Sequence, residues 1–551
     1  MRRKRKKIKG SLITLDEVFL DSRNMPGFDQ ERFEGRLEKP LGRASFLMSG
    51  VVFLIIGFLL FSRVFILEGV KGKTLALRAE NNYFRKIPVL ANRGVIYDRL
   101  NKELAWNEPA GRAYIDLPGL NILLGYVGKG SDSLAGFVGK QGLEKFYNLE
   151  LRGKDGVEIQ EINSKEDLIS ANVQTSAEDG KNLQLSVDAE LQSVVYNIIK
   201  NTAETYGFEG GAAVMMDVDN GEIFVLTSYP EYQSQTLVKG EPIEEINSFL
   251  TNPQKPFLNR AVSGLYAPGS IIKPMIALAA LEEKVITPEK QILSAGSISI
   301  PNPFFPDKKS VFYDWRAHGW VDLRRALAVS SDVYFYTIGG GFGDVQGLGI
   351  NKINTYAKLF GFGSKTNIDL DNEEAGVVPS AEGKAFFDKD DPTWRVGDTY
   401  NASIGQGNFQ ITPVQAAVFA AVLANEGKIL KPHLTDLAQE NGTRRILASV
   451  SPENFQAVKE GMRIAVLEGT AAGLNGLGIE VAAKTGTSEI GSGKFVNSWL
   501  IGFFPYQKPK FAIAAVMEKG RATNLVIWKK LDKFFKINKN EWRWIILKKI
   551  S

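Results

Sequence analysis

Two side chains that could share a proton stand three residues apart in the sequence YAPGSIIKPM, residues 266–275. Pro268 and Gly269 end an extended stretch, so Ser270 is predicted to begin a helix with Lys273 one turn later on the same face. Unpaired N–H groups and the helix dipole at such a start favour developing negative charge. A lysine accepts a serine proton where burial or a second cation favours its neutral form. The pair is a candidate nucleophile and base; a helix-capping serine beside a solvated lysine is the alternative.

Two further polar segments follow later in the chain. Ser330 and Asp332 stand at the end of a predicted helix in LAVSSDVYFY, and Lys484 opens the sequence Lys-Thr-Gly-Thr inside the strand-like run VAAKTGTSE. Taken singly, a helix-end serine and a strand lysine beside a turn are ordinary structural features. Their occurrence in this order after Ser270 favours a shared site.

The elements around these segments predict one sheet built from distant parts of the chain. Two β-type runs, GGAAVMMDV and EIFVLTS, are joined by the turn residues Asp219-Asn220-Gly221. A calcium loop is the alternative interpretation of this turn, but its oxygen ligands fall at the wrong intervals. Helical segments follow at 271–284 and 412–427, and strand-like runs return at 481–489, 498–505 and 510–518. Strands at both ends with helices between them indicate a sheet covered by helices.

Composition excludes several classes of protein. The chain has 551 residues, no cysteine and a formal net charge of +5. Without cysteine there is no disulfide, thiolate zinc site or cysteine nucleophile. The basic residues gather at the two ends and leave a mildly acidic middle, whereas the body of a nucleic-acid-binding protein would be basic.

A membrane anchor is predicted near the N-terminus. Residues 44–62 carry no charge and would measure roughly 28 Å as a helix, about the thickness of a bilayer core. A cleavable signal peptide and a buried core helix are the alternatives. The basic start MRRKRKKIKG and the positive-inside rule place the N-terminus in the cytoplasm and the region after about Glu68 outside it.

The ordered set Ser-x-x-Lys, Ser-x-Asp and Lys-Thr-Gly resembles the signature of penicillin-binding proteins and serine β-lactamases. With the anchor, RGVIYDR (93–99), GLEKFYNLELRGKDG (142–156) and LSVDAELQ (185–192), the chain is identified as similar to class B penicillin-binding proteins. The stretch WRVGDTYNASIGQGNFQITPVQ (394–415) resembles the elongation type, with the division type as the alternative. The resemblance implies an α+β protein with a membrane helix, a pedestal domain and a β-lactamase-like transpeptidase domain.

The resemblance also implies catalytic roles. Ser270 would attack the penultimate D-alanine of a stem peptide, and Lys273, helped by burial and the Lys484 ammonium, would take its proton. Ser330 would pass a proton to the leaving amine. Asp332, where most relatives have Asn, would pair with Lys273.

Substrate-binding residues are implied as well. Lys484, Thr485 and Thr487 would hold the terminal carboxylate of the substrate, while Gly486 would let its backbone approach the strand. The backbone N–H groups of Ser270 and Thr487 would form the oxyanion hole. Gln406 and Gly407 would line or brace the site.

No cofactor is expected. Some elongation-type relatives bind a metal near the second motif through a cysteine; this chain has none, so no metal is expected either. The expected partners are peptidoglycan stem peptides, β-lactams, the membrane, a SEDS-family glycosyltransferase and other membrane proteins of the elongation complex, but no nucleic acid. A β-lactamase, a carboxypeptidase and a non-catalytic sensor or scaffold are the alternatives.

The predicted organisation runs in five parts. In order they are a cytoplasmic tail (1–43), the anchor (44–67), a non-catalytic pedestal (68–204), the transpeptidase domain (205–537) and a basic tail (538–551).

Overall fold

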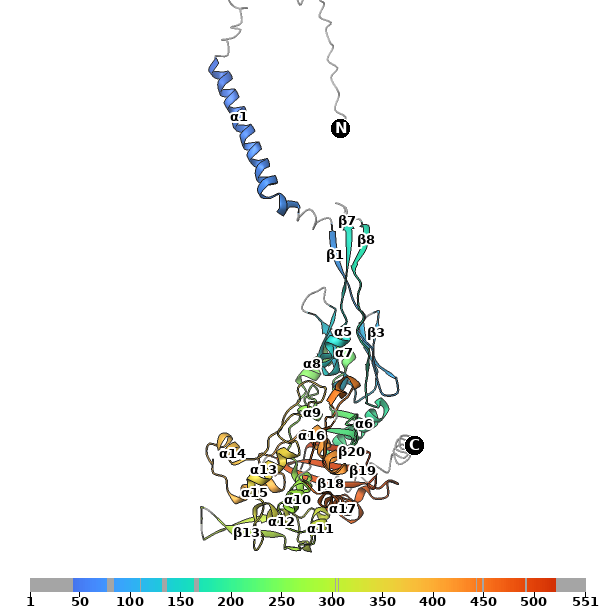
Figure 1. Cartoon of the computed structure of the whole chain (residues 1–551), viewed down its shortest axis with the longest axis vertical. Coiled ribbons are helices and arrows are strands. Elements are labelled where there is room, and N and C mark those ends of the chain that lie inside the picture. Colours follow the sequence, from blue (N-terminus) through green and yellow to red (C-terminus); the bar gives the residue numbers. More distant parts are fainter. Residues whose placement is uncertain are drawn as a thin grey trace, which may run out of the picture. The chain divides into compact units, whose positions relative to one another are not determined.

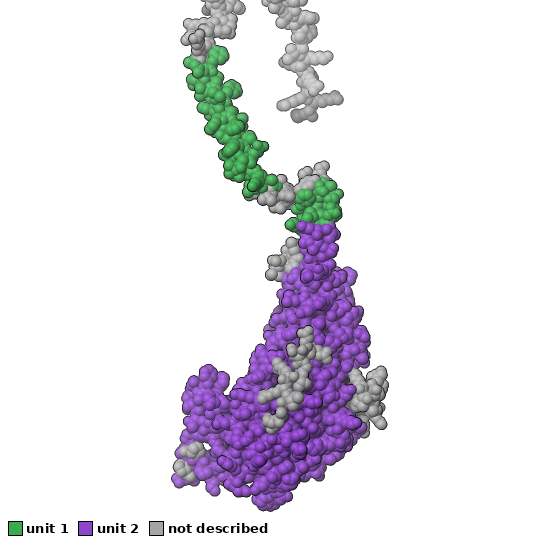
Figure 2. Space-filling model, in the orientation of Figure 1, with its two compact units in different colours: residues 1–87, 159–172 green, residues 88–158, 173–551 purple. Residues whose placement is uncertain are grey.

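A computed structural model describes residues 43–76, 84–109, 111–130, 136–162, 168–302, 304–305, 307–441, 443–447, 450–490 and 493–521. The predicted tails, apart from Arg43, lie outside these residues. The chain divides into two compact units (Figure 2), residues 1–87 with 159–172 and residues 88–158 with 173–551.

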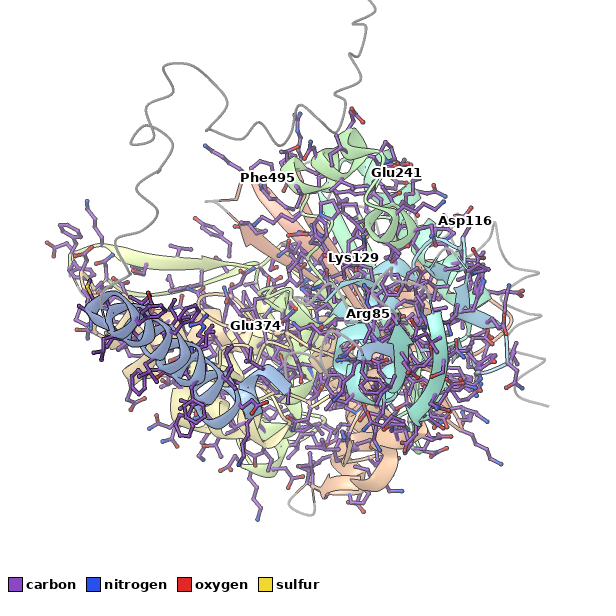
Figure 3. All side chains as sticks on the ribbon, turned by 90° about the horizontal axis from the view of Figure 1, so that it is seen from above. Arg85, Asp116, Lys129, Glu241, Glu374 and Phe495 are labelled. Atoms are coloured by element: carbon purple, nitrogen blue, oxygen red, sulfur yellow. The ribbon has the colours of Figure 1, made fainter. Side chains whose placement is uncertain are left out.

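The first unit contains the predicted anchor. Helix α1 (Arg43–Phe65) continues into a π-helical turn (Ile66–Val70), and residues Phe46–Val70 are long and apolar enough to cross a membrane. The side chains of α1 project on all sides (Figure 3), and no part of the apolar stretch is buried against protein. A helix that is apolar all round suits lipid better than water. The prediction of a membrane-length helix here is confirmed.

Smaller sheets precede the main body of the chain. One has the strand order β1-β7-β8, a second β4-β3-β2-β9, and a third is the hairpin β5-β6. The elements are β1 (Phe84–Val89), β2 (Ile96–Tyr97), β3 (Glu103–Glu108), β4 (Gly111–Tyr114), α3 (Asn121–Leu124), β5 (Tyr126–Lys129), β6 (Phe137–Gln141), α4 (Gly142–Phe146), α5 (Asn148–Arg152), β7 (Gly156–Ile162), β8 (Leu168–Thr175) and β9 (Leu183–Gln184). This mixture agrees with the predicted α+β character.

A five-stranded antiparallel sheet lies at the centre of the second unit (Figure 1), in the order β11-β10-β20-β19-β18. Its strands are β10 (Gly210–Asp217), β11 (Ile223–Tyr229), β18 (Ala482–Ile490), β19 (Phe495–Phe504) and β20 (Phe511–Arg521). The turn predicted at residues 219–221 joins β10 to β11. Because β10 pairs with β20, the sheet unites the two ends of this region, as predicted.

Helices cover both faces of the sheet, and the alternation along β10 shows why. Val214 belongs to one buried cluster with residues of α10 (Lys273–Glu282) and α16 (Pro413–Ala424). Its neighbour Met215 belongs to another, with residues of α6 (Ala189–Tyr206) and α17 (Pro452–Glu468). Successive strand residues point to opposite faces, so a strand that is apolar throughout needs helices on both sides.

The remaining elements connect these layers. They are α7 (Ser234–Lys239), α8 (Ile243–Thr251), α9 (Arg260–Ser263), η4 (Gly269–Ile272), β12 (Ile292–Ser294), β13 (Ser297–Pro301), β14 (Lys309–Tyr313), β15 (Gly319–Val321), α11 (Leu323–Val329), α12 (Asp332–Gly340), α13 (Gly349–Leu359), α14 (Ala381–Phe387), α15 (Val396–Ser403), β16 (Lys428–Leu430), η5 (Asp436–Asn441), β17 (Thr443–Ile446) and η6 (Ala472–Leu474). Edge strand β18 packs against η4, which brings the first and third motifs together.

Candidate active site

The predicted nucleophile lies on the short 3-10 turn η4, directly before α10. Pro274 stands in the first turn of α10, where its missing N–H costs nothing. Lys273 is fully buried, and Ser270 is half-buried without capping the helix through its side chain. The alternative of a capping serine beside a solvated lysine is therefore wrong.

Close backbone contacts set the position of Ser270. Gly269 has a φ of +56°, and a Cβ there would lie 2.5 Å from the carbonyl oxygen of Thr487. The Gly269 N–H also donates to the carbonyl of Gly405, with N and O 2.9 Å apart. Only glycine tolerates this conformation and proximity. Ser270 is thus held between β18 and the loop that carries Gln406.

The second motif is a sharp turn between two helices. Helix α11 ends at Ser330, which adopts a left-handed conformation with φ +59°, and Ser331 then caps α12 by accepting from the N–H of Tyr334. Asp332 is the first residue of α12. The reversal presents Ser330 and Asp332 to the same ammonium group, that of Lys273.

Lys273 makes three polar contacts with this turn. Its Nζ lies 2.8 Å from the Ser330 carbonyl oxygen, 3.2 Å from Ser330 Oγ and 2.7 Å from Asp332 Oδ1. The predicted pairing of Asp332 with Lys273 is confirmed. Among the described residues, the Ser270 hydroxyl makes no hydrogen bond to Lys273 in this structure.

Lys484 completes the cluster from strand β18. Its buried Nζ lies 2.8 Å from Ser330 Oγ and donates to the Thr485 carbonyl at 2.8 Å. Burial, followed by the charge of Lys273, holds the pKa of Lys484 well below its usual value, while Asp332 opposes this shift. The effects of burial and of a neighbouring ammonium, which were expected at Lys273, are found at Lys484, while Lys273 is paired with Asp332 as was also expected.

The structure places the predicted substrate-binding residues along β18 and beside it. Thr485 shares a 2.8 Å hydrogen bond with the hydroxyl of Thr470, and Thr487 is half-buried next to Gly269. A Cβ at Gly486 would lie 2.9 Å from the Pro268 carbonyl oxygen. The chain itself therefore already requires glycine at this position.

The loop after α15 braces the nucleophile. Gly405 contacts Gly269 directly, and the following residue, Gln406, is half-buried with its N–H donating to the Asn401 carbonyl at 2.9 Å. Gly407 is exposed, with φ +73°.

Sequence reasoning missed two residues that support these segments. Trp499 on β19 is fully buried, and its Nε1 donates to the carbonyl of Ala267 at 2.9 Å, three residues before Ser270. Asp314 is buried next to the second motif and accepts from the Ser331 hydroxyl at 2.8 Å. A tryptophan in a buried strand needs a partner for its N–H, which was a usable signal. Asp314 gave none, because its partners are remote in sequence.

No metal-binding group is evident in the described part of the chain. No cluster there has three or more His, Cys, Asp or Glu side chains placed to hold an ion.

Comparisons with known proteins agree with this geometry. The family described as the penicillin binding protein transpeptidase domain matches residues 211–530, more than half of the 551, and the penicillin-binding protein dimerisation domain matches residues 121–185. Two similar curated proteins carry the name peptidoglycan D,D-transpeptidase MrdA. The one from Acinetobacter baumannii is 32% identical over 72% of this chain and 62% of its own length, and the one from Haemophilus influenzae 30% identical over 72% and 64%. The matches thus span less than two thirds of these relatives.

Solved structures are similar over most of the chain. PBP2 from Helicobacter pylori in complex with MreC has a TM-score of 0.68 and 27% identity, over 82% of this chain and 99% of that one. Pseudomonas aeruginosa PBP2 in complex with WCK 5153 has a TM-score of 0.67 and 29% identity, over 80% and 94%. The motifs, the sheet and these matches together show that the chain belongs to the penicillin-binding protein transpeptidase family.

Proposed function

We propose that this chain is a peptidoglycan D,D-transpeptidase that cross-links stem peptides during cell-wall elongation and is acylated by β-lactams at Ser270. The supporting observation is that the buried Nζ atoms of Lys273 and Lys484 both lie within hydrogen-bond distance of the Ser330 hydroxyl. Lys273 stands one helical turn after Ser270. The names of the similar curated proteins support the same activity.

In the first half-reaction, Ser270 Oγ attacks the carbonyl carbon of the penultimate D-alanine. Lys273 takes the Ser270 proton once its own excess proton has moved through Ser330 to Lys484, whose neutral form is favoured by burial. The C–N bond to the terminal D-alanine then breaks, and the leaving amine receives a proton from Ser330, which Lys273 replaces. Asp332 compensates the charge on Lys273 whenever that side chain is protonated.

The backbone N–H groups of Ser270 and Thr487 stabilise the negative oxygen of each tetrahedral intermediate. Lys484, Thr485 and Thr487 hold the substrate carboxylate. In the second half-reaction, an amine of a neighbouring stem peptide attacks the acyl-enzyme, and exclusion of water from this step separates transfer from hydrolysis.

We further propose that the N-terminus is cytoplasmic and that the catalytic region is extracytoplasmic. Its partners are then a SEDS-family glycosyltransferase and other elongation-complex membrane proteins; the similar Helicobacter pylori protein was solved with MreC. The proposed pedestal (68–204) and transpeptidase domain (205–537) enclose the ranges matched by the two family models.

The test is the intact mass of the full-length protein in detergent, followed over hours after mixing with a penicillin, beside Ser270→Ala. A stable one-to-one adduct that the variant lacks supports the proposal. An adduct that is rapidly lost points to a β-lactamase or carboxypeptidase. Absence of any adduct would overturn the proposal and favour a scaffold.

A further inference from the structure

A buried carboxylate lies behind the second motif. Asp314 follows β14 and is only 8% exposed. Its Oδ2 lies 3.1 Å from Ser294 Oγ, 2.8 Å from Ser331 Oγ and 3.0 Å from the N–H nitrogen of Val333, while Oδ1 accepts from the N–H of Trp315 at 2.9 Å. One carboxylate thus binds segments from three separate parts of the chain.

These contacts converge on the turn that presents Ser330 and Asp332. Ser331 lies between these two residues, and Val333 directly follows them. A non-glycine residue with positive φ, as at Ser330, persists only where its surroundings hold it in place. The Asp314 carboxylate meets both a side chain and a backbone N–H of this turn, so it opposes rotation of α12 as well as displacement of Ser331.

The residues around Asp314 do not fit the metal known from some elongation-type relatives. His318 Nε2 lies 3.6 Å from Asp314 Oδ1 and lacks a hydrogen-bond partner among the described residues. These two side chains could ligate zinc, which takes about four thiolate, imidazole or carboxylate ligands. The other side chains bonded to Asp314 are the neutral hydroxyls of Ser294 and Ser331, which suit a hydrogen-bonded cluster better than a zinc site.

We infer that Asp314 is a positioning residue, and that the hydrogen-bonded cluster of Asp314, Ser294 and Ser331 holds Ser330 and Asp332 against the two lysines without a metal ion. The inference rests on the proposed function, because its consequence is the rate at which Ser270 is acylated. Asp314 does not touch the reacting atoms. Its loss should therefore slow the acylation step while leaving the initial binding of a β-lactam nearly unchanged.

The experiment measures acylation of the full-length protein in detergent by a fluorescent penicillin, in stopped flow over a range of concentrations. This separates the dissociation constant of the initial complex from the rate constant of acylation. Asp314→Asn should lower the rate constant about 10- to 100-fold, because the amide has one accepting oxygen where the carboxylate has two and carries no charge. Either the Trp315 N–H or the donors of Ser294, Ser331 and Val333 then face an NH2 group, and the bonds that remain are weaker than those to a carboxylate. The dissociation constant should change less than about 2-fold.

Two further variants serve as a control and as a second test of the cluster. Asp307→Asn, an exposed carboxylate between the same strands β13 and β14, is the matched control and should react as the wild type does. Ser294→Ala removes one donor of the cluster and should slow acylation by a smaller factor of about 3, which keeps the inference testable if Asp314→Asn does not fold. Wild-type rate constants in folded Asp314→Asn, or in Ser294→Ala, would overturn it.

A further experiment tests whether acylation requires a metal ion. Wild-type protein is treated with the zinc chelator 1,10-phenanthroline, its zinc content is determined by mass spectrometry, and acylation is measured again, with and without added Zn²⁺. Unchanged acylation without stoichiometric zinc supports the inference. Loss of acylation that Zn²⁺ restores would overturn it. If the wild type is not acylated at all, the proposed function is wrong. If the wild type and Asp314→Asn are acylated at the same rate, the proposed function stands and only the inference about Asp314 is wrong.

Discussion

Two buried clusters in the second unit contain the same charges, two cations and one carboxylate, but differ in how those charges are satisfied. In the proposed pedestal, Glu144 accepts from Arg93 Nε at 2.5 Å and from Arg112 Nε at 2.8 Å. The remaining guanidinium nitrogens donate to fixed acceptors, among them the Gly94 carbonyl and the Asn148 side chain. Every charge in this cluster has partners supplied by the chain.

In the candidate active site, Asp332 pairs with Lys273 at 2.7 Å, while the hydrogen-bond partners of Lys484 among the described residues are a hydroxyl and a carbonyl oxygen. The pKa of Lys484 falls as a result of burial and the neighbouring ammonium. The pedestal cluster therefore serves stability, whereas the site leaves one cation incompletely compensated. A substrate carboxylate would supply the missing charge.

The largest effect is expected from Lys484→Met. Loss of the group that we propose binds the substrate carboxylate should lower the second-order rate constant of penicillin acylation about 1,000-fold, equivalent to about 4 kcal/mol. Since a buried amine without a carboxylate partner of its own is replaced by an apolar side chain, the melting temperature should stay level or rise. Stopped-flow acylation and calorimetry on the same sample test both parts. A variant that melts earlier yet reacts at the wild-type rate would contradict the comparison.

Glu144→Gln should have the opposite profile. Two buried guanidinium groups lose their carboxylate, so the free energy of unfolding should fall by about 3–5 kcal/mol. Acylation of the protein that remains folded should stay within about 2-fold of wild type, as the cluster serves no chemical step. Denaturant unfolding and acylation assays measure the two quantities. Glu150→Gln, an exposed neighbour, is the control and should change neither.

Gly486→Ala should affect both stability and rate. The new Cβ would lie 2.9 Å from the Pro268 carbonyl oxygen and 2.9 Å from Ile271 Cγ2, so η4 and Ser270 must shift. We expect a loss of about 1–3 kcal/mol in unfolding free energy and about 10-fold slower acylation. Gly136→Ala, where a Cβ would lie at the ordinary distance of 3.7 Å from Leu90 Cδ2, is the control and should change neither quantity. An unchanged rate in Gly486→Ala would show that η4 tolerates displacement.

The smallest signal is proton uptake on ligand binding. In the empty site the pKa of Lys484 is depressed, and a bound carboxylate favours the cation and raises it again. Between these two pKa values, binding should therefore draw at most about one proton onto the protein. Calorimetry of β-lactam binding to Ser270→Ala in buffers of different ionisation enthalpy measures this uptake. Proton uptake should vanish in the double variant that carries both Ser270→Ala and Lys484→Met. Uptake that persists in the double variant would show that another group binds the proton.

Much of the fold could be predicted from local sequence patterns. The charge-free run after Arg43 determined the membrane-length helix, and the apolar runs around residues 210–229 and 481–518 determined the strands. Glycine in Lys-Thr-Gly was also predictable as a required residue. Its contact with the chain was not, because the neighbouring atoms belong to Pro268 and Ile271, more than two hundred residues earlier in the chain.

The linear order of residues by itself indicated the chemistry that we propose for this protein. Five residues, Ser270, Lys273, Ser330, Asp332 and Lys484, occur in types and contexts that were recognisable without coordinates. Only the tertiary structure decided how the charge is shared among them. The Asp332–Lys273 pair was expected, but protonation depends on burial and on distances of a few ångströms, and these place Lys484 fully buried beside the Lys273 ammonium. The support from Asp314 and Trp499 was likewise decided by folding, because hydrogen bonds depend on which atoms a fold brings into contact.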